Sequence, residues 1–212
     1  MKSATTALFI LLLLSSCCMA QEDRFEFRKQ PMFGLKAGIN YSIPQFQKGM
    51  PFSISEKTGM CGGAQLSVPF SLLFGIQPEL MLGQRGFVST GNLKGAPYMF
   101  TRIGNYVDVP FFFTYKPNAL LTLLAGPQYS RLYKSNDLYS VSEMGLSKEG
   151  SFLNARFRQN QLGLLAGLDV NKQYMIVGIR TGVDTGKSLY DNATASPAYR
   201  NVWLQFTFGY RY

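Results

Sequence analysis

Histidine is absent from this chain of 212 residues, and cysteine is rare. Without histidine, Ser-His-Asp and Cys-His catalysis and His-ligated zinc sites are excluded. The cysteines are Cys17, Cys18 and Cys61, and the first two belong to an apolar segment at the N-terminus. If that segment is cleaved off, Cys61 has no partner for a disulfide within the chain. We therefore predict a non-enzymatic protein with no catalytic residue, no metal site and no cofactor.

Long hydrophobic runs are also scarce. Lys2 and the short apolar run after it have the pattern of a signal peptide, too short to cross a bilayer as a helix. The favoured interpretation is a signal peptide of residues 1–20 that is removed after Ala20. In the alternative, the sequence L-S-S-C is a lipobox, and Cys17 carries a lipid anchor. Beyond residue 20 no run of eighteen apolar residues occurs, so no transmembrane helix is expected.

Strict alternation is what the sequence does contain, most clearly in its last twelve residues, N-V-W-L-Q-F-T-F-G-Y-R-Y. The even-numbered positions are all apolar, and the odd ones are polar or small except for Trp203. Side chains alternate between the two faces of a strand, so one face is apolar along its whole length. An apolar face that ends on an aromatic residue is typical of the last strand of a bacterial outer-membrane barrel.

Seven further segments show strand character, and most have about the ten residues that a tilted strand needs to cross a bilayer. With the C-terminal segment, the predicted strands are 32–43, 60–68, 72–83, 103–115, 120–132, 161–170, 174–184 and 202–212. Short connections (69–71, 116–119, 171–173) alternate with long ones (44–59, 84–102, 133–160, 185–201). This pattern predicts an all-β fold, an eight-stranded antiparallel up-and-down transmembrane β-barrel.

The barrel assignment also divides the chain and orients it. Residues 21–31 become a short charged periplasmic leader, and residues 32–212 become the outer-membrane β-barrel domain. Short turns of such barrels face the periplasm, and long loops face outward. We therefore expect both termini in the periplasm and the long loops outside the cell. The longest loop, 133–160, is the expected recognition surface, because binding residues concentrate on loops.

Glycine indicates which face is the inside. Most strand glycines share the parity of the polar residues: Gly34, Gly38, Gly63, Gly75, Gly83, Gly126, Gly163, Gly167, Gly178, Gly182 and Gly209. The interior of an eight-stranded barrel is just wide enough for side chains, so glycines there make room for large residues such as Arg180, Arg211, Phe112 and Trp203. The apolar face then points to lipid, unlike that of a soluble barrel. Three prolines inside predicted strands, Pro78, Pro110 and Pro127, are interpreted as bulges or strand-end positions.

Eight charged residues have the inward parity, four of each sign: Lys36, Glu79, Arg85, Asp108, Asp169, Arg180, Asp184 and Arg211. Counted from the turns, Lys36, Asp169 and Arg211 lie low, Glu79, Asp108 and Arg180 lie near mid-height, and Arg85 and Asp184 lie high. Buried charges are tolerated when they are paired and hydrogen-bonded. We therefore predict a structural charge network that fills the lumen, in preference to a selective aqueous pore.

With the strands laid out, the chain resembles the PorT-type outer-membrane β-barrel family of Bacteroidetes. The motifs that carry the resemblance are F-G-L-K-A-G-I-N-Y-S (33–42), I-Q-P-E-L-M-L-G-Q-R-G (76–86), Y-V-D-V-P-F-F-F-T-Y-K (106–116), L-L-A-G-P-Q-Y-S (123–130), L-L-A-G-L-D-V (164–170) and the terminal L-Q-F-T-F-G-Y-R-Y. The resemblance implies a link to secretion or gliding machinery. It also implies that Phe208, Tyr210 and Tyr212 form an insertion signal for the barrel-assembly machinery.

The formal charge of +9 favours anionic partners. In an exported protein these are outer-membrane lipid and lipopolysaccharide, not nucleic acid. Ordinary solubility charge in the loops is an equally good explanation of the basic balance. We expect a structural or interaction role with a protein partner in an envelope complex. A small transport or ligand-binding barrel is the alternative.

Overall fold

The computed structural model describes residues 28, 30–46, 53–93, 96–141, 147–149, 159–186 and 199–212. The strands within them are β1 (Met32–Phe46), β2 (Ser53–Pro69), β3 (Phe74–Leu93), β4 (Ala96–Tyr115), β5 (Leu121–Val141), β6 (Ser147–Glu149), β7 (Asn160–Lys172), β8 (Met175–Asp184) and β9 (Tyr199–Arg211). No helix among the described residues has the length and apolar character needed to cross a membrane. The predicted signal peptide and most of the predicted leader lie outside the described residues.

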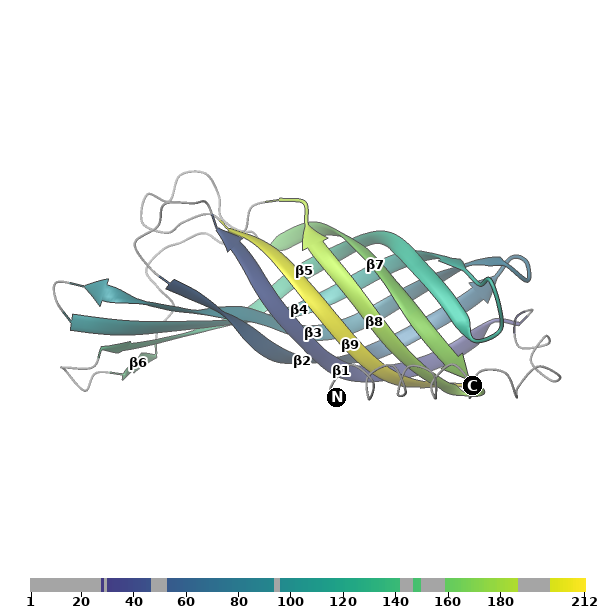
Figure 1. The fold of residues 1–212 in the computed structure, drawn as a ribbon, viewed down its shortest axis with the longest axis horizontal. Coiled ribbons are helices and arrows are strands. Elements are labelled where there is room, and N and C mark those ends of the chain that lie inside the picture. The colour runs from purple at the N-terminus through teal and green to yellow at the C-terminus, as the bar shows by residue number, and fades with distance from the viewer. Residues whose placement is uncertain are drawn as a thin grey trace, which may run out of the picture.

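Eight of these strands close into a ring (Figure 1). Each pairs antiparallel with its neighbours in the order β4-β3-β2-β1-β9-β8-β7-β5, and β4 pairs with β5 to complete the circle. The first and last strands meet at pairs such as Lys36–Gly209 and Ile39–Phe206. The short β6 only adds to the outer part of β5, at residues 138–140. The predicted fold, an eight-stranded antiparallel up-and-down transmembrane barrel, is confirmed.

One end of the barrel, the turn end, carries the C-terminus and three tight connections (Figure 1). The Ser71 hydroxyl accepts a hydrogen bond from the amide of Phe74 at 3.0 Å, and the Asn118 side chain accepts one from Leu121 at 2.8 Å. Gln173 has a φ of 53°, as the two-residue turn between β7 and β8 requires. Side-chain hydrogen bonds in two turns and the positive φ in the third accompany the three short turns that the sequence predicts, although β3 begins at Phe74 and not at residue 72.

The other end, the loop end, differs from the sequence-based prediction. β3, β4 and β5 hold 20, 20 and 21 residues, whereas β7, β8 and β9 hold 13, 10 and 13. The predicted loop 84–102 is therefore wrong: its residues continue β3 and β4 as a paired hairpin from Arg85–Gly104 to Leu93–Ala96. Predicted loops 44–59, 133–160 and 185–201 likewise contain strand residues, in β1, β2, β5, β6, β7 and β9. The outward apolar residues of β3 end at Leu82, and the alternation that predicts the strand ends with them. The pairing of β3 with β4 continues to Leu93.

Inside and outside follow the predicted parity. Burial alternates residue by residue along β8, from exposed Met175 to buried Ile176 and so on to Asp184. The inward residues include a small apolar core of Phe112, Leu124, Leu165 and Trp203. The outward face is apolar, with exposed side chains that include Leu35, Leu80, Phe113, Leu164, Val177 and Phe208. A polar interior and an apolar exterior are thus the arrangement that the glycine parity predicts.

Two glycines show how the crowded interior depends on missing side chains. A Cβ at Gly182 would meet the indole of buried Trp203, and a Cβ at Gly167 would lie 2.6 Å from Cγ of Arg180. At both glycines, the added Cβ would lie closer to its neighbour than van der Waals contact allows. The large inward side chains therefore occupy the space that their glycine neighbours leave open.

The three strand prolines are not at bulges. Pro78 pairs with Phe111, Pro110 with Gln128 and Pro127 with Leu164, all inside the strands. The register shifts of β2–β3 and β4–β5 lie elsewhere, between Glu56 and Cys61 and between Asn105 and Tyr106. The interpretation as bulges or strand ends is therefore wrong. Each proline removes one amide donor, and the register on both sides continues unchanged.

Candidate functional site

The middle of the lumen holds an ion quartet, defined as Lys36, Glu79, Asp169 and Arg180. Lys36 Nζ lies 2.8 Å from Glu79 Oε1 and 3.4 Å from Asp169 Oδ2. Arg180 lies 2.6 Å from Glu79 and 3.1 Å from Asp169. None of the four side chains is more than 2% exposed. Two positive and two negative groups balance, as burial in a narrow lumen requires.

The four members of the quartet come from β1, β3, β7 and β8. Gln77 adds a hydrogen bond to Glu79 at 2.8 Å, and the Arg180 guanidinium lies 4.8 Å from the centre of the Phe112 ring. Every carboxylate oxygen of the quartet is within bonding distance of a cation. Both carboxylates are therefore engaged by two cations each, which favours a structural role for the quartet.

Nearer the loop end lies an ion triad of Arg85, Asp108 and Asp184. Arg85 forms an ion pair with Asp108, and its second terminal nitrogen lies 3.7 Å from Asp184. Its guanidinium sits over the rings of Tyr106 and Trp203, at 4.4 and 4.1 Å from their centres. Asn201 donates a hydrogen bond to Asp184 at 2.8 Å. Two cation–π contacts and one amide donor thus add to the ion pairs of this cluster.

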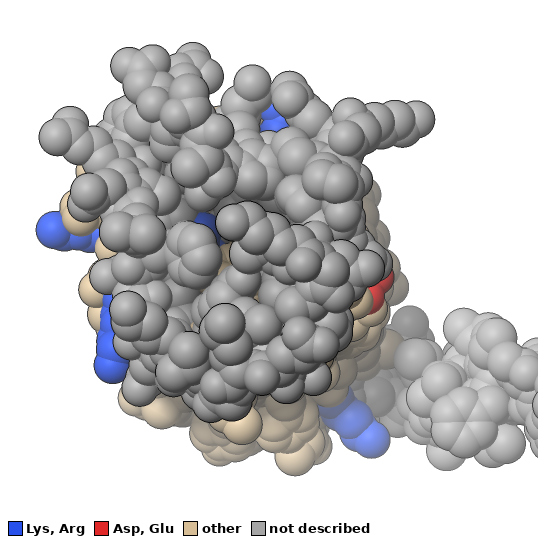
Figure 2. All heavy atoms as spheres, turned by 90° about the vertical axis from the view of Figure 1, so that its left-hand side faces the viewer, with Lys and Arg blue, Asp and Glu red and all other residues tan. Residues whose placement is uncertain are grey.

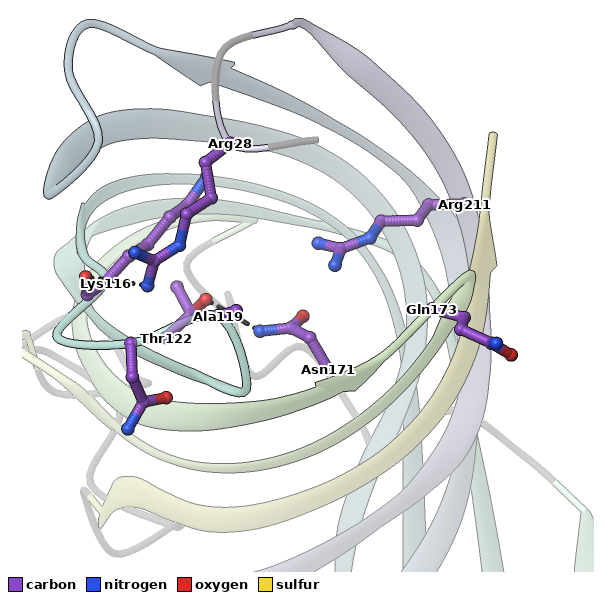
Figure 3. Close-up of a pocket in the computed structure, with 8 residues that line it drawn as sticks. Arg28, Lys116, Ala119, Thr122, Asn171, Gln173 and Arg211 are labelled. Atoms are coloured by element: carbon purple, nitrogen blue, oxygen red, sulfur yellow. Dashed lines mark hydrogen bonds between the residues drawn. The ribbon is translucent and has the colours of Figure 1, made fainter. Parts of the chain in front are cut away.

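Seven of the eight predicted network residues therefore fall into two clusters. Asp108, expected at the level of Glu79, instead bonds Arg85, because the β3–β4 register places it opposite Met81, closer to the loop end. Arg211, expected low in the network, lies apart from both clusters. It lines a cavity at the turn end together with Lys116 and Arg28 (Figure 3).

Lys116 and Arg28 are not among the site residues that the sequence predicts. Lys116 could have been found, because it continues the inward parity of Asp108, Phe112 and Thr114 one residue past β4. Burial and the nearby guanidinium groups of Arg211 and Arg28 lower the pKa of Lys116 to about 8. Burial also lowers the pKa of Arg28. Arg28 follows no strand pattern, so no sequence signal indicates its place.

Aromatic pairs surround the outside of the turn end. Phe33 and Tyr212 lie 5.5 Å apart, Phe74 and Tyr115 5.3 Å, and Tyr174 and Tyr210 5.7 Å, measured between ring centres. Such a girdle is expected at a membrane–water interface. The residues of the predicted insertion signal, Phe208, Tyr210 and Tyr212, all point outward and are more than half exposed. Two backbone hydrogen bonds between Tyr212 and Phe33, of 2.8 and 3.1 Å, hold the C-terminus to β1.

The extended parts of β3, β4 and β5 form an arm that projects beyond the rest of the barrel (Figure 1). We define the arm as residues 84–93, 96–105 and 133–141. Phe87 and Phe100 pack edge to face within it, 6.0 Å apart, and Arg102 lies over Phe100 at 5.1 Å. Met99 and Leu138 are about half exposed. Figure 2 views this end and shows several Lys and Arg side chains around the described surface, with an acidic group at one edge.

No family model and no curated protein matches the chain. Solved structures do resemble it. Ail, the attachment invasion locus protein of Yersinia pestis, aligns over 86% of this chain and 99% of its own, with 13% identity and a TM-score of 0.48. OprG from Pseudomonas aeruginosa covers 87% of this chain and 97% of its own, with 12% identity and a TM-score of 0.46. Neisserial surface protein A covers 85% and 97%, with 9% identity and a TM-score of 0.43. The fold assignment rests on the strand pairing described above.

Proposed function

We propose that this protein is a non-enzymatic outer-membrane barrel that anchors its projecting arm for contact with a partner protein. The observation that carries the proposal is the difference in strand length. Crossing a bilayer takes about 9–11 residues per strand, and β8 has ten. β3, β4 and β5 have about twice that number. Roughly ten extra residues at about 3.3 Å each extend the arm some 30 Å along the strands.

The outward face supports the placement in a membrane. A continuous apolar exterior has no favourable contact with water, and lipid removes that cost. Closure of the ring pairs the backbone groups between strands, as a spanning structure must do in lipid. In this proposal the turn end faces the periplasm and the arm lies outside the cell.

Orientation is tested by labelling intact cells with a membrane-impermeant maleimide. The background carries Cys61→Ser, and single cysteines are introduced at exposed Lys134, at the loop end, and exposed Asn118, at the turn end. Lys134→Cys should react in intact cells, and Asn118→Cys only after the outer membrane is permeabilised. The reverse pattern would show that the orientation is wrong.

The arm's role is tested by replacing residues 87–102 with Asn-Gly, which closes the hairpin at the pair Gly86–Ile103. The shortened protein should still show the heat-modifiable gel shift of a folded barrel. It should lose a stoichiometric partner that the full-length protein retains on purification from native membranes. Retention of that partner without the arm would contradict the proposed role.

The resemblance to the PorT-type family adds a finer proposal, that the partner belongs to a secretion or gliding-type envelope complex. Identification of the arm-dependent partner by mass spectrometry tests this part separately. A partner from an unrelated complex would remove the finer proposal and leave the interaction role intact.

A transport role is the second candidate, since small barrels can carry a solute. The ion quartet argues against it, because four side chains bonded to one another occupy the lumen at one level. Conductance in planar bilayers distinguishes the two functions. Reproducible single-channel steps would favour transport, and a silent bilayer that contains folded protein would favour the anchor.

A further inference from the structure

The outer face of β5 changes from apolar to basic near the loop end. Above the turn end its exposed outward residues are Leu123, Ala125, Pro127 and Tyr129. The next outward residue, Arg131, is the first charged one on this face, and it is exposed as well. The charge marks the end of the apolar band that β5 presents to lipid.

A bulge brings a second cation to the same face. β5 gains one residue between the pairs Tyr106–Leu132 and Asn105–Lys134, so Tyr133 has no partner on β4. Tyr133 and Lys134 follow one another and are both exposed, which regular alternation does not allow. Tyr133 is 59% exposed. Arg131, Tyr133 and Lys134 thus share the outer surface at the base of the arm, and we call these three residues the β5 patch.

The height of the β5 patch follows from the length of the strand. From Leu121, where β5 begins at the turn end, to Arg131 is a step of ten residues. At about 3.3 Å per residue and a tilt of about 40°, this step rises about 25 Å, the height of the apolar band of such barrels. Exposed Tyr129, whose hydroxyl donates a hydrogen bond to Asn160 at 2.8 Å, lies just below, as an interfacial aromatic residue does.

Lys134 lies further out than Arg131. Three residues of tilted strand add at most about 8 Å of height. The headgroup layer of a bilayer adds roughly 5–8 Å to the hydrocarbon core on each side. Arg131 is therefore level with the border of the acyl chains, and Lys134 is level with the hydrated headgroups.

Among the described residues, no carboxylate pairs with either cation of the patch. Their register partners on β4 and β7 are neutral: Val107 and Asn160 for Arg131, and Asn105 for Lys134. Asp137, the next acidic residue along β5, lies three positions beyond Lys134 and in register with Arg102. Three positions along a strand lead to the opposite face, so the outer face here is positively charged.

We propose that the β5 patch binds a phosphorylated glycolipid of the outer leaflet, of the lipopolysaccharide class. Two cations at different heights suit a headgroup with more than one phosphate, because phosphate oxygens accept strong hydrogen bonds from Arg and Lys. The exposed ring of Tyr133 lies between them and offers a flat apolar surface to a sugar ring. An ordinary anionic phospholipid, with one phosphate and no sugar ring, would use only part of the patch.

The inference rests on the proposed orientation, in which the loop end lies outside the cell and the patch faces the outer leaflet. Binding is measured on the purified barrel, where orientation has no influence. The labelling experiment on intact cells and the binding experiment can therefore fail separately.

The test uses the folded barrel, purified in a maltoside detergent and freed of native lipid. Lipid A with two phosphates is added, and its dissociation constant is measured by native mass spectrometry. We expect one tightly held lipid A per chain. Arg131→Gln/Lys134→Gln should weaken binding at least tenfold, because each cation near an anionic lipid surface contributes roughly a fivefold gain in affinity. Tyr133→Ala should weaken binding by a smaller factor.

Arg200→Gln is the matched control. Arg200 is exposed at the loop end of β9, outside the β5 patch, and its removal should leave binding unchanged. Lipid A that lacks both phosphates should bind the wild-type barrel at least tenfold more weakly. In lipid-free detergent the gel shift of every variant should match that of wild type, which verifies that each is folded.

Three results would overturn the proposal. The first is equal binding of lipid A by wild type and by Arg131→Gln/Lys134→Gln, and the second is no binding by the wild-type barrel. The third is binding of phosphatidylglycerol as tight as that of lipid A, since the patch would then recognise anionic lipid in general and not a glycolipid.

Discussion

Replacing Arg180 by leucine tests the ion quartet most directly. Arg180 is 1% exposed, and it contacts both carboxylates of the quartet, Glu79 and Asp169. Its removal leaves two buried carboxylates and one cation, Lys36, so the quartet changes from neutral to a charge of −1. Removing one partner of a buried ion pair costs about 3–5 kcal/mol, because the remaining charge is desolvated without compensation.

The expected consequence is a large loss of thermal stability. For a chain of this size, a change of 1 kcal/mol in the free energy of unfolding moves the midpoint of thermal unfolding by roughly 2–4 °C. Arg180→Leu should therefore lower that midpoint by roughly 6–20 °C. The assay is the temperature at which the folded band disappears in the heat-modifiable gel shift. Arg131→Leu is the control, since this arginine is exposed on the outside of β5.

A double substitution separates the charge effect from the loss of packing. Arg180→Leu/Glu79→Gln restores neutrality, with one cation and one carboxylate left, and should recover part of the lost stability. An Arg180→Leu midpoint within about 2 °C of wild type would refute the idea that paired charges stabilise the lumen. No recovery in the double variant would attribute the loss to packing against Phe112 instead.

Three further predictions follow from the structure. Gly182→Ala should destabilise the folded barrel by about 1–3 kcal/mol in urea titrations, because its Cβ would meet the Trp203 indole, whereas Gly62→Ala, whose nearest neighbour is 3.3 Å away, should cost less. Deleting residues 208–212 should abolish membrane insertion, because it removes the turn-end part of the β1–β9 pairing, from Gly34–Arg211 to Ala37–Phe208, and the predicted insertion signal; normal outer-membrane levels of the truncated chain would contradict this. The pKa of Lys116 is lowered to about 8 from 10.5, so the protonated lysine destabilises the folded state by at most about 3 kcal/mol, and this cost is present in full below pH 8. The stability of wild type relative to Lys116→Met should therefore rise between pH 8 and 10.5. A flat difference between the two proteins in urea titrations across that range would refute the prediction.

The parts of the fold that sequence predicts are those in contact with lipid. The apolar stripe is an uninterrupted period-two signal, and it places all eight ring strands. The arm escapes prediction because polar residues such as Gln84 and Thr101 interrupt its outward alternation, so exposed Met99 forms no continuous apolar stripe. Backbone pairing in water leaves no hydrophobic signature, so only the register of the finished structure reveals it.

The charged interior is predictable by residue but not by partner. Parity alone identifies the inward charges, including all seven members of the two clusters. Their grouping depends on how far each strand is staggered against the next, and alternation carries no information on stagger. The turn-end cavity shows the same limit, since Lys116 has inward parity, whereas its neighbours Arg28 and Arg211 come from the two ends of the chain.

The long-range pairing within the quartet also bears on how the barrel reaches its register. Lys36 and Asp169 are 133 residues apart, and Arg180 and Glu79 are 101 apart, so these contacts form only when β1, β3, β7 and β8 face one another. A slip of one residue would place the apolar stripe inside, and lipid itself excludes it. A slip of two residues keeps the correct face outward, but it would move Arg180 by about 6.6 Å along its strand. That displacement exceeds the reach of its bonds to Glu79 and Asp169, which are 2.6 to 3.3 Å long. The quartet therefore disfavours the misregistered barrel that the apolar pattern alone would accept.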